Sequence, residues 1–345
     1  MNKITNKKEL TMNKLNKIGV SALCGSLAAI SAANAGDLTV TGGADMTWMS
    51  KSGQVTGNPI GIGSNFGFAG SGELDNGWTV DLSIAHTNGG AYSNANVTIG
   101  VPGVGDIRID QGTSGTGIDR YDDIVPTAWE EADGAGLSAG ITKVAGGSAG
   151  STIEFTPETT PAGLTANIAW TPDADGADSA DKGTSGDGGI ATSGWDVALK
   201  ATDEMHGVSG LTLYGGYSLV DQDQSKTSVS DDREEWTAAI VYAVGNFSAG
   251  YQLSEDKQGT TTNNTYDNTY YSLTFNVNDD LSVSYGHVES DKEGSNTAEA
   301  DSLQAAYTYG GATFRIAEID VTNQAYSTAA TADKDATVIS LGLAF

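Results

Sequence analysis

Apolar and polar residues alternate along most of this chain, and this period of two limits its fold more strongly than any other feature. In the segment that begins at Leu38, the side chains of Val40, Met46 and Trp48 share one side, while threonine and aspartate occupy the other. Segments 78–85 and 337–345 repeat the pattern. Successive side chains of a strand point to opposite faces, so the pattern predicts strands with one apolar and one polar face. The fold class is therefore all-β.

Composition excludes several other classes of protein. The chain has 17 Lys and Arg against 44 Asp and Glu, a net charge of −27, whereas a nucleic-acid partner requires clustered basic residues. Its only sustained apolar stretch, residues 18–30, is too short to cross a bilayer as a helix. With the single cysteine Cys24, no disulfide framework can form. We expect no nucleic-acid partner and no helical membrane bundle.

The N-terminus has the pattern of an export signal. Lys14 and Lys17 precede the apolar stretch 18–30, and the small residues 33–35 follow as a cleavage site. We predict a signal peptide over 1–35, removed after Sec export, with Met12 as the alternative start. Cleavage removes five lysines, one glutamate and the only cysteine, which leaves 36–345 with a net charge of −31.

Two architectures fit strands with one polar face: a soluble β-sandwich and a membrane barrel. The lengths of the connections favour the barrel, because short turns and long acidic loops alternate along the chain. This asymmetry is typical of a 16-stranded antiparallel transmembrane β-barrel with short periplasmic turns and long external loops. The predicted strands are 37–49, 65–74, 78–87, 95–101, 105–111, 151–157, 163–171, 194–202, 211–221, 234–244, 246–255, 267–277, 281–289, 299–309, 312–320 and 336–345.

The aromatic residues gather near the two ends of these predicted strands, as they do at the two surfaces of a bilayer. The outer group is Trp48, Phe66, Trp170, Trp195, Trp236, Tyr251 and Tyr271; the periplasmic group is Trp78, Tyr242, Phe247, Phe275, Tyr309, Phe314 and Phe345. Residues 112–150 contain no convincing strand pair, so we predict that they form one long third external loop. We also expect Gly61 to Gly63 to lie in a loop.

A signal peptide, no mature cysteine, sixteen amphipathic strands, a long third loop and a terminal Phe345 together make residues 36–345 resemble a Gram-negative general porin of the alphaproteobacterial type. The resemblance implies a homotrimer in the outer membrane, in contact with its lipid and lipopolysaccharide. It implies a water-filled channel for passive diffusion of ions and small hydrophilic solutes, with 112–150 folded inward as the constriction loop. Phe345 resembles the signature that the outer-membrane insertion machinery reads.

Carried over to this chain, the constriction would present the acidic residues of the third loop to the pore. These residues are Asp119, Asp122, Asp123, Glu130, Glu131 and Asp133. The strand register places three basic residues on the inner wall: Arg108, Arg315 and Lys200. The same register turns inward the acids Asp45, Glu73, Asp81, Asp106, Asp110, Glu154 and Asp196. Because the cluster of wall arginines expected from the resemblance is missing, we predict a cation-preferring pore with a weak transverse field.

Each of these residues also has a simpler interpretation. An inward acid can be a solvated lumen residue, and Arg108 can pair locally with Asp106 or Asp110. Arg120 is expected to neutralise its acidic neighbours, and Trp129 to anchor the loop against the wall. A substrate-selective channel, a plugged structural or adhesive barrel and a soluble sandwich remain the alternative functions and folds.

Calcium and catalysis have little support in the sequence. The acids Asp173, Asp175, Asp178 and Asp181 suggest a loop-bound Ca²⁺, but their spacing departs from the EF-hand pattern. The three histidines, His86, His206 and His287, have no spacing typical of a metal site or a catalytic triad. We expect neither a cofactor nor an enzyme.

Overall fold

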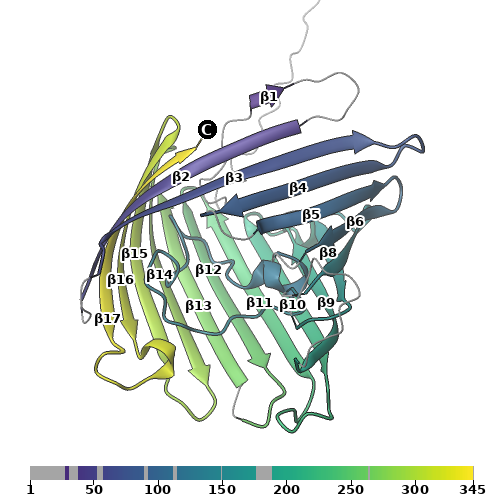
Figure 1. Cartoon of the computed structure of the whole chain (residues 1–345). Coiled ribbons are helices and arrows are strands. Elements are labelled where there is room, and N and C mark those ends of the chain that lie inside the picture. The colour runs from purple at the N-terminus through teal and green to yellow at the C-terminus, as the bar shows by residue number, and fades with distance from the viewer. Residues whose placement is uncertain are drawn as a thin grey trace, which may run out of the picture.

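The computed structural model describes residues 28–30, 38–52, 57–88, 92–111, 115–148, 150–175, 189–262 and 265–344. Long strands dominate it (Figure 1). The strands are β1 Ala28–Ile30, β2 Leu38–Lys51, β3 Ile60–Glu73, β4 Thr79–Thr87, β5 Tyr92–Val101, β6 Gly105–Asp110, β7 Thr152–Pro157, β8 Leu164–Thr171, β9 Ala191–Ala201, β10 Leu211–Gln222, β11 Arg233–Val244, β12 Phe247–Lys257, β13 Thr265–Asn276, β14 Leu281–Lys292, β15 Ala298–Tyr309, β16 Ala312–Thr322 and β17 Lys334–Ala344.

Strands β2 to β17 form a closed antiparallel barrel. Each strand pairs with the next one in the chain, and β17 returns to pair with β2 from Ala336 opposite Lys51 to Ala344 opposite Gly43. Closure leaves no strand edge unpaired. The all-β class and the sixteen-stranded barrel are thus confirmed, and the soluble sandwich is wrong. The short β1 lies within the predicted signal peptide and pairs with the start of β2.

Long and short connections alternate along most of the barrel as predicted, but only four residues separate β4 from β5, one fewer than separate β3 from β4. Several strands also extend further than expected. Strand β3 begins at Ile60, so the predicted loop over Gly61 to Gly63 is wrong. Ile60 and Ile62 continue the outward apolar face, at 61% and 74% exposure, while both glycines fall on the inner face. The glycines were misleading because a lumen-facing strand position needs no side chain. Strand β5 likewise begins earlier than expected, at Tyr92.

The outer surface of the barrel is apolar and its inner surface is mainly polar. Leu303 is 61% exposed on the outside, whereas its neighbours Ser302 and Gln304 are buried inside. Burial alternates in this way along β12, β16 and β17. An apolar belt around a polar interior is the arrangement that a lipid bilayer requires.

The outer aromatic residues on β12 and β13 lie in the middle of their strands. Tyr251 and Tyr271 are paired with each other, and both strands continue beyond them toward the external loops. Beyond this level the same outward face carries acids, among them Glu255 and Asp267. Charged side chains are expelled from the hydrocarbon layer, so these strand ends rise above the aromatic level.

Among the described residues, helical structure is confined to the connections. It comprises the 3₁₀ turns η2 Gly117–Tyr121 and η3 Gln324–Tyr326 and the short α1 Asp203–His206. In the described part of the chain, no helix has the length and apolar character needed to span a membrane. Phe345, the cleavage site and Cys24 lie outside the described residues.

Candidate functional site

The connection between β6 and β7 folds into the barrel and crosses its interior (Figure 1). We call its described residues, 115–148, the strap. An outgoing limb, 117–137, runs along the inner wall from β7 toward β17, and a return limb, 138–148, comes back nearer the external rim. Most of its contacts lie on the wall formed by β7 to β17, and it also contacts Met49 of β2 and Arg108 of β6.

At the start of the outgoing limb, η2 packs closely against the inner wall. Ile118 is fully buried, and it lies against the inward face of Gly216, where any Cβ would come within 2.8 Å of the Ile118 side chain. The backbone N–H of Gly117 donates to Glu154 on β7 at 2.8 Å, and Arg120 forms an ion pair with the same carboxylate. Arg120 therefore pairs with a wall acid, while its charge also acts on the neighbouring Asp119.

Polar wall side chains hold the backbone of the outgoing limb. Gln252 accepts the N–H of Ile124 at 2.9 Å and donates to the carbonyl oxygen of Tyr121 at 2.7 Å. Further along, Gln304 accepts the N–H groups of Trp129 and Glu130, each at 3.1 Å. Each such bond satisfies a buried backbone group, so the limb lies flat on the wall without forming a strand.

The tip of the strap packs into an apolar patch inside the barrel. Leu137 and Ala139 are buried against Val288, Ile319 and Val338, which point inward from β14, β16 and β17. This cluster is the hydrophobic core of the molecule. Trp129 packs beside it and so anchors the loop to the wall, as its position away from a strand end suggested.

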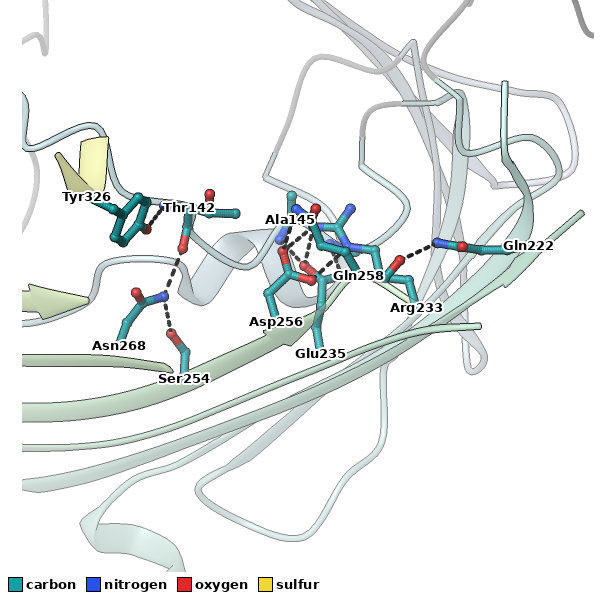
Figure 2. A network of polar contacts seen from close by, with 11 residues as sticks. Thr142, Ala145, Gln222, Arg233, Glu235, Ser254, Asp256, Gln258, Asn268 and Tyr326 are labelled. Carbon is teal, nitrogen blue, oxygen red and sulfur yellow. Dashed lines mark hydrogen bonds and ion pairs between the residues drawn. The ribbon is translucent and has the colours of Figure 1, made fainter. Parts of the chain in front are cut away.

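The return limb is held by a buried ionic network (Figure 2). The carboxylate of Glu235 accepts the backbone N–H groups of Ala145 and Gly146, each at 2.8 Å. Arg233 pairs with Glu235 at 2.8 Å and with Asp256 through two bonds at 2.9 and 3.0 Å. Both carboxylate side chains have no exposed surface.

The external loop between β16 and β17 covers the turn between the two limbs. The N–H of Ala325 donates to the carbonyl oxygen of Ala139 at 2.8 Å, and the Tyr326 hydroxyl accepts the N–H of Thr142 at 3.1 Å. Asn268 of β13 donates to the carbonyl of Thr142 (Figure 2). Both limbs are thus bound to the barrel independently.

Four of the six predicted loop acids come together in the middle of the strap. Asp123 and Glu131 share the ammonium of Lys143, at 2.7 and 2.8 Å. Asp122 and Glu130 lie in the same electrostatic cluster, and neither forms an ion pair among the described residues. All four are half-buried.

The other two predicted loop acids have structural contacts instead. Asp133 is buried and accepts bonds from the Ser138 hydroxyl at 3.2 Å and the Ala139 N–H at 3.3 Å, which closes the turn of the strap. Asp119 accepts the N–H of Gly115 and a bond from Ser148, which joins the two limbs at their base.

Burial and mutual repulsion shift the acidic cluster toward neutral pH. Burial, reinforced by Asp123, raises the pKa of Asp122 to about 8, and burial, opposed by Lys143, raises that of Asp123 to about 6. Burial and Glu131 raise the pKa of Glu130 to about 7. Burial acts in the same direction on Glu131, but Lys143 outweighs it and lowers the pKa of this group.

The three predicted basic wall residues all face the interior. Arg315 is buried, pairs with Asp45 at 3.0 Å, and lies over the ring of Trp129 at 5.7 Å. Arg108 bonds to Asp110 at 2.6 Å, which is one of the two local partners suggested for it. Lys200 lies 5.7 Å from the ring of Tyr214.

The wall of β2 to β6 has few contacts with the strap, at Met49 of β2 and Arg108 of β6, and borders the free part of the lumen. Asp81 and Asp106 are exposed there and face inward on β4 and β6. Small residues dominate the inner face of β3, where Gly61, Gly63 and Gly67 have no strap atom within 4 Å of an added Cβ. Any aqueous path must therefore run between this wall and the acidic cluster of the strap.

Several residues of the site were not predicted. Lys143 was overlooked because a lone lysine in an acidic loop has no spacing signal. Gln252, Gln304 and Glu235 lie at inward positions, and the parity of their strands places them there; their role depends on the path of the strap. Of the four acids suggested as Ca²⁺ ligands, Asp173 and Asp175 lie within the described residues, and Asp178 and Asp181 lie outside them.

Comparison with known proteins gives a consistent result. A family model described as Gram-negative porin matches residues 19–313. Among solved structures, OmpF from Salmonella typhi, in complex with daunomycin, aligns with a TM-score of 0.64 at 12% identity, covering 92% of this chain and 100% of that one. An anion-selective porin from Comamonas acidovorans aligns with a TM-score of 0.61 at 13% identity, covering 89% and 99%. A triple mutant of Rhodopseudomonas blastica porin gives 0.57 at 14% identity, covering 89% and 100%. No curated protein sequence matches the chain significantly.

Proposed function

The chain belongs to the Gram-negative porin family, and on that basis we propose that it is a cation-preferring diffusion channel whose selectivity is set by the acidic cluster of the strap. The family and the barrel identify an outer-membrane channel for ions and small solutes, not an enzyme. The fold does not decide the sign of the selectivity, since one structure of similar fold is an anion-selective porin. The side chains of this lumen must decide it.

One observation carries the proposal: the acids of the strap outnumber the cations available to them. Asp123 and Glu131 bind the single ammonium of Lys143, and the neighbouring Asp122 and Glu130 form no ion pair among the described residues. The wall arginines compensate only in part, because Arg108 is bound to Asp110, and Arg315, whose charge also acts on Glu130, is bound to Asp45. Charged side chains in a constriction select ions of opposite sign, so this constriction favours cations.

We expect the reversal potential of the purified protein in a planar bilayer, under a KCl gradient, to report cation preference. The physical reason is the net negative charge between the strap and the exposed Asp81 and Asp106. A reversal potential of the anion-selective sign would refute the proposal. Conductance steps in the same recording distinguish an open porin from a plugged barrel. Saturating flux with one solute would indicate a substrate-selective channel instead.

Cation preference should increase as the pH rises from 5 to 9. A raised pKa means that a carboxyl group is neutral below that value, so Asp123, Glu130 and Asp122 gain charge in that order, at about pH 6, 7 and 8. Reversal potentials recorded across this range measure the effect. Lys143, the cation bound within the cluster, keeps its charge throughout, because Asp123 and Glu131 outweigh burial and raise its pKa. In the matched variant Asp122→Asn/Asp123→Asn/Glu130→Gln the pH dependence should disappear; if it persists, other groups cause it.

The remaining expectations from the family follow as proposals. We propose that 1–35 is a removed signal peptide, that the protein is a homotrimer, and that Phe345 serves recognition by the insertion machinery. Contact with lipopolysaccharide is supported by the outward acids above the aromatic level, including Glu255 and Asp267, which divalent cations can bridge to phosphates. Mass spectrometry of the purified protein and its size in detergent test the first two proposals.

A further inference from the structure

The two limbs of the strap are joined to each other at three places. At the base, Asp119 bonds to Ser148, and at the tip, Asp133 bonds to Ser138 and Ala139. In the centre, the ammonium of Lys143 on the return limb holds two carboxylates of the outgoing limb. Only the central link contains a cation, and it lies within the acidic cluster.

We propose that Lys143 is the positioning residue of this constriction, which fixes both the separation of the strap limbs and the charge that a permeating ion meets. This inference rests on the proposed function. The Lys143 side chain is 21% exposed, and its partners Asp123 and Glu131 are 28% and 23% exposed, so the link borders water without being freely solvated. Partial desolvation strengthens such an ion pair relative to a surface pair.

The wall contacts of each limb make the role of Lys143 separable from folding. Gln252 and Gln304 hold the outgoing limb on either side of the cluster, and Glu235 holds the return limb next to Lys143. Without the ammonium, both limbs keep these bonds. What changes is local: Asp123 and Glu131 lose their shared counter-ion, repel each other, and are free to turn toward the lumen.

Two effects therefore follow from removing the ammonium, and they can be measured separately. At alkaline pH, where Asp123 and Glu131 stay ionised without the ammonium, the constriction gains one net negative charge, which increases cation preference. The centre of the strap loses its link, which increases its motion and hence the noise of the open-channel current. If Lys143 were purely structural, its removal would increase the current noise but would not change the cation preference in a way that depends on charge.

The test compares Lys143→Met with the charge-matched double variant Lys143→Met/Glu131→Gln. At pH 9, we expect Lys143→Met to raise the cation-to-anion permeability ratio about twofold, and to increase current noise. The double variant removes one charge of each sign, so its ratio should return to that of the unmodified protein while the noise stays high. Lys143→Arg keeps the positive charge and the hydrogen-bond donors, so its permeability ratio and current noise should match those of the unmodified protein.

Lys257→Met provides the control, because Lys257 pairs with Glu255 on the outward face and its side chain is 51% exposed. It should change neither the ratio nor the noise. The inference is overturned if Lys143→Met behaves like Lys257→Met, or if the double variant keeps the raised ratio of Lys143→Met. An anion-selective unmodified channel would refute the proposed function by itself, and the changes relative to that channel would still test Lys143.

Discussion

Replacement of Arg233 by methionine should lower the free energy of unfolding by about 3–5 kcal/mol, the range for breaking a buried ion pair on one side. The guanidinium is the shared partner of Glu235 and Asp256, whose side chains are both fully buried (Figure 2). In its absence, two carboxylates stay desolvated without a counter-ion. Equilibrium unfolding in detergent micelles, followed by circular dichroism, measures the loss.

The two carboxylates, rather than the lost arginine contacts, should account for most of this effect. The triple variant Arg233→Met/Glu235→Gln/Asp256→Asn removes every charge of the network and should recover much of the stability, because a neutral replacement of a buried ion pair is often tolerated. Lys257→Met breaks a more exposed pair within β12, the strand that carries Asp256, and should cost about 0–1 kcal/mol. An Arg233→Met variant as stable as Lys257→Met would contradict this account.

Substitution of Gly250 by valine should reduce the single-channel conductance and destabilise the protein by about 1–3 kcal/mol through overpacking. Gly250 faces inward on β12, beneath the strap. A Cβ at this position would approach the Pro126 ring at 2.5 Å and the Val125 backbone at 3.1 Å. Neither group can rotate away, so the outgoing limb must move off the wall, into the lumen. Conductance in planar bilayers and unfolding in micelles measure the two effects.

A second glycine separates this displacement from a general effect of valine in a strand. Gly215 on β10 has the opposite orientation, and a Cβ there would meet only the Thr237 carbonyl oxygen, at 4.0 Å. Gly215→Val should therefore leave the conductance unchanged. Equal conductance in the two variants would mean that the strap does not border the permeation path.

The barrel and the orientation of its wall residues could be predicted because both follow from a period of two. Closure, strand number and the inward positions of Arg108, Arg315 and Lys200 depend on local alternation and on the order of connections. The prediction that the outer aromatic group lies at the strand ends was less accurate for Tyr251 and Tyr271, because it assumed that the strands end at the membrane surface. Polar outward residues continue the same alternation above the membrane and give no signal of where the lipid ends.

The path of the strap could not be predicted, because it depends on contacts between segments far apart in the sequence. One signal was present. On β16 and β17, the inward positions Ile319, Val321 and Val338 are apolar, whereas a water-filled lumen favours polar residues there. An apolar inner wall implies a cover, and the longest predicted loop is 112–150. The roles of Asp133 and Lys143 then depend on side-chain contacts within that loop, for which their sequence positions carry no pattern.

The bare inner face of β3 has a consequence for how such a channel can change over generations. At most positions in a folded protein, added side-chain volume disturbs neighbours, but at Gly63 an added Cβ meets only the Asn88 side chain, at 3.4 Å, and Asp45 atoms at 3.9 and 4.0 Å. Volume added there is taken from the water path, while the strand ladder and the strap anchors stay as they are. A single substitution at such a position can therefore narrow the channel and exclude a harmful solute, and no compensating substitution is needed to keep the barrel folded.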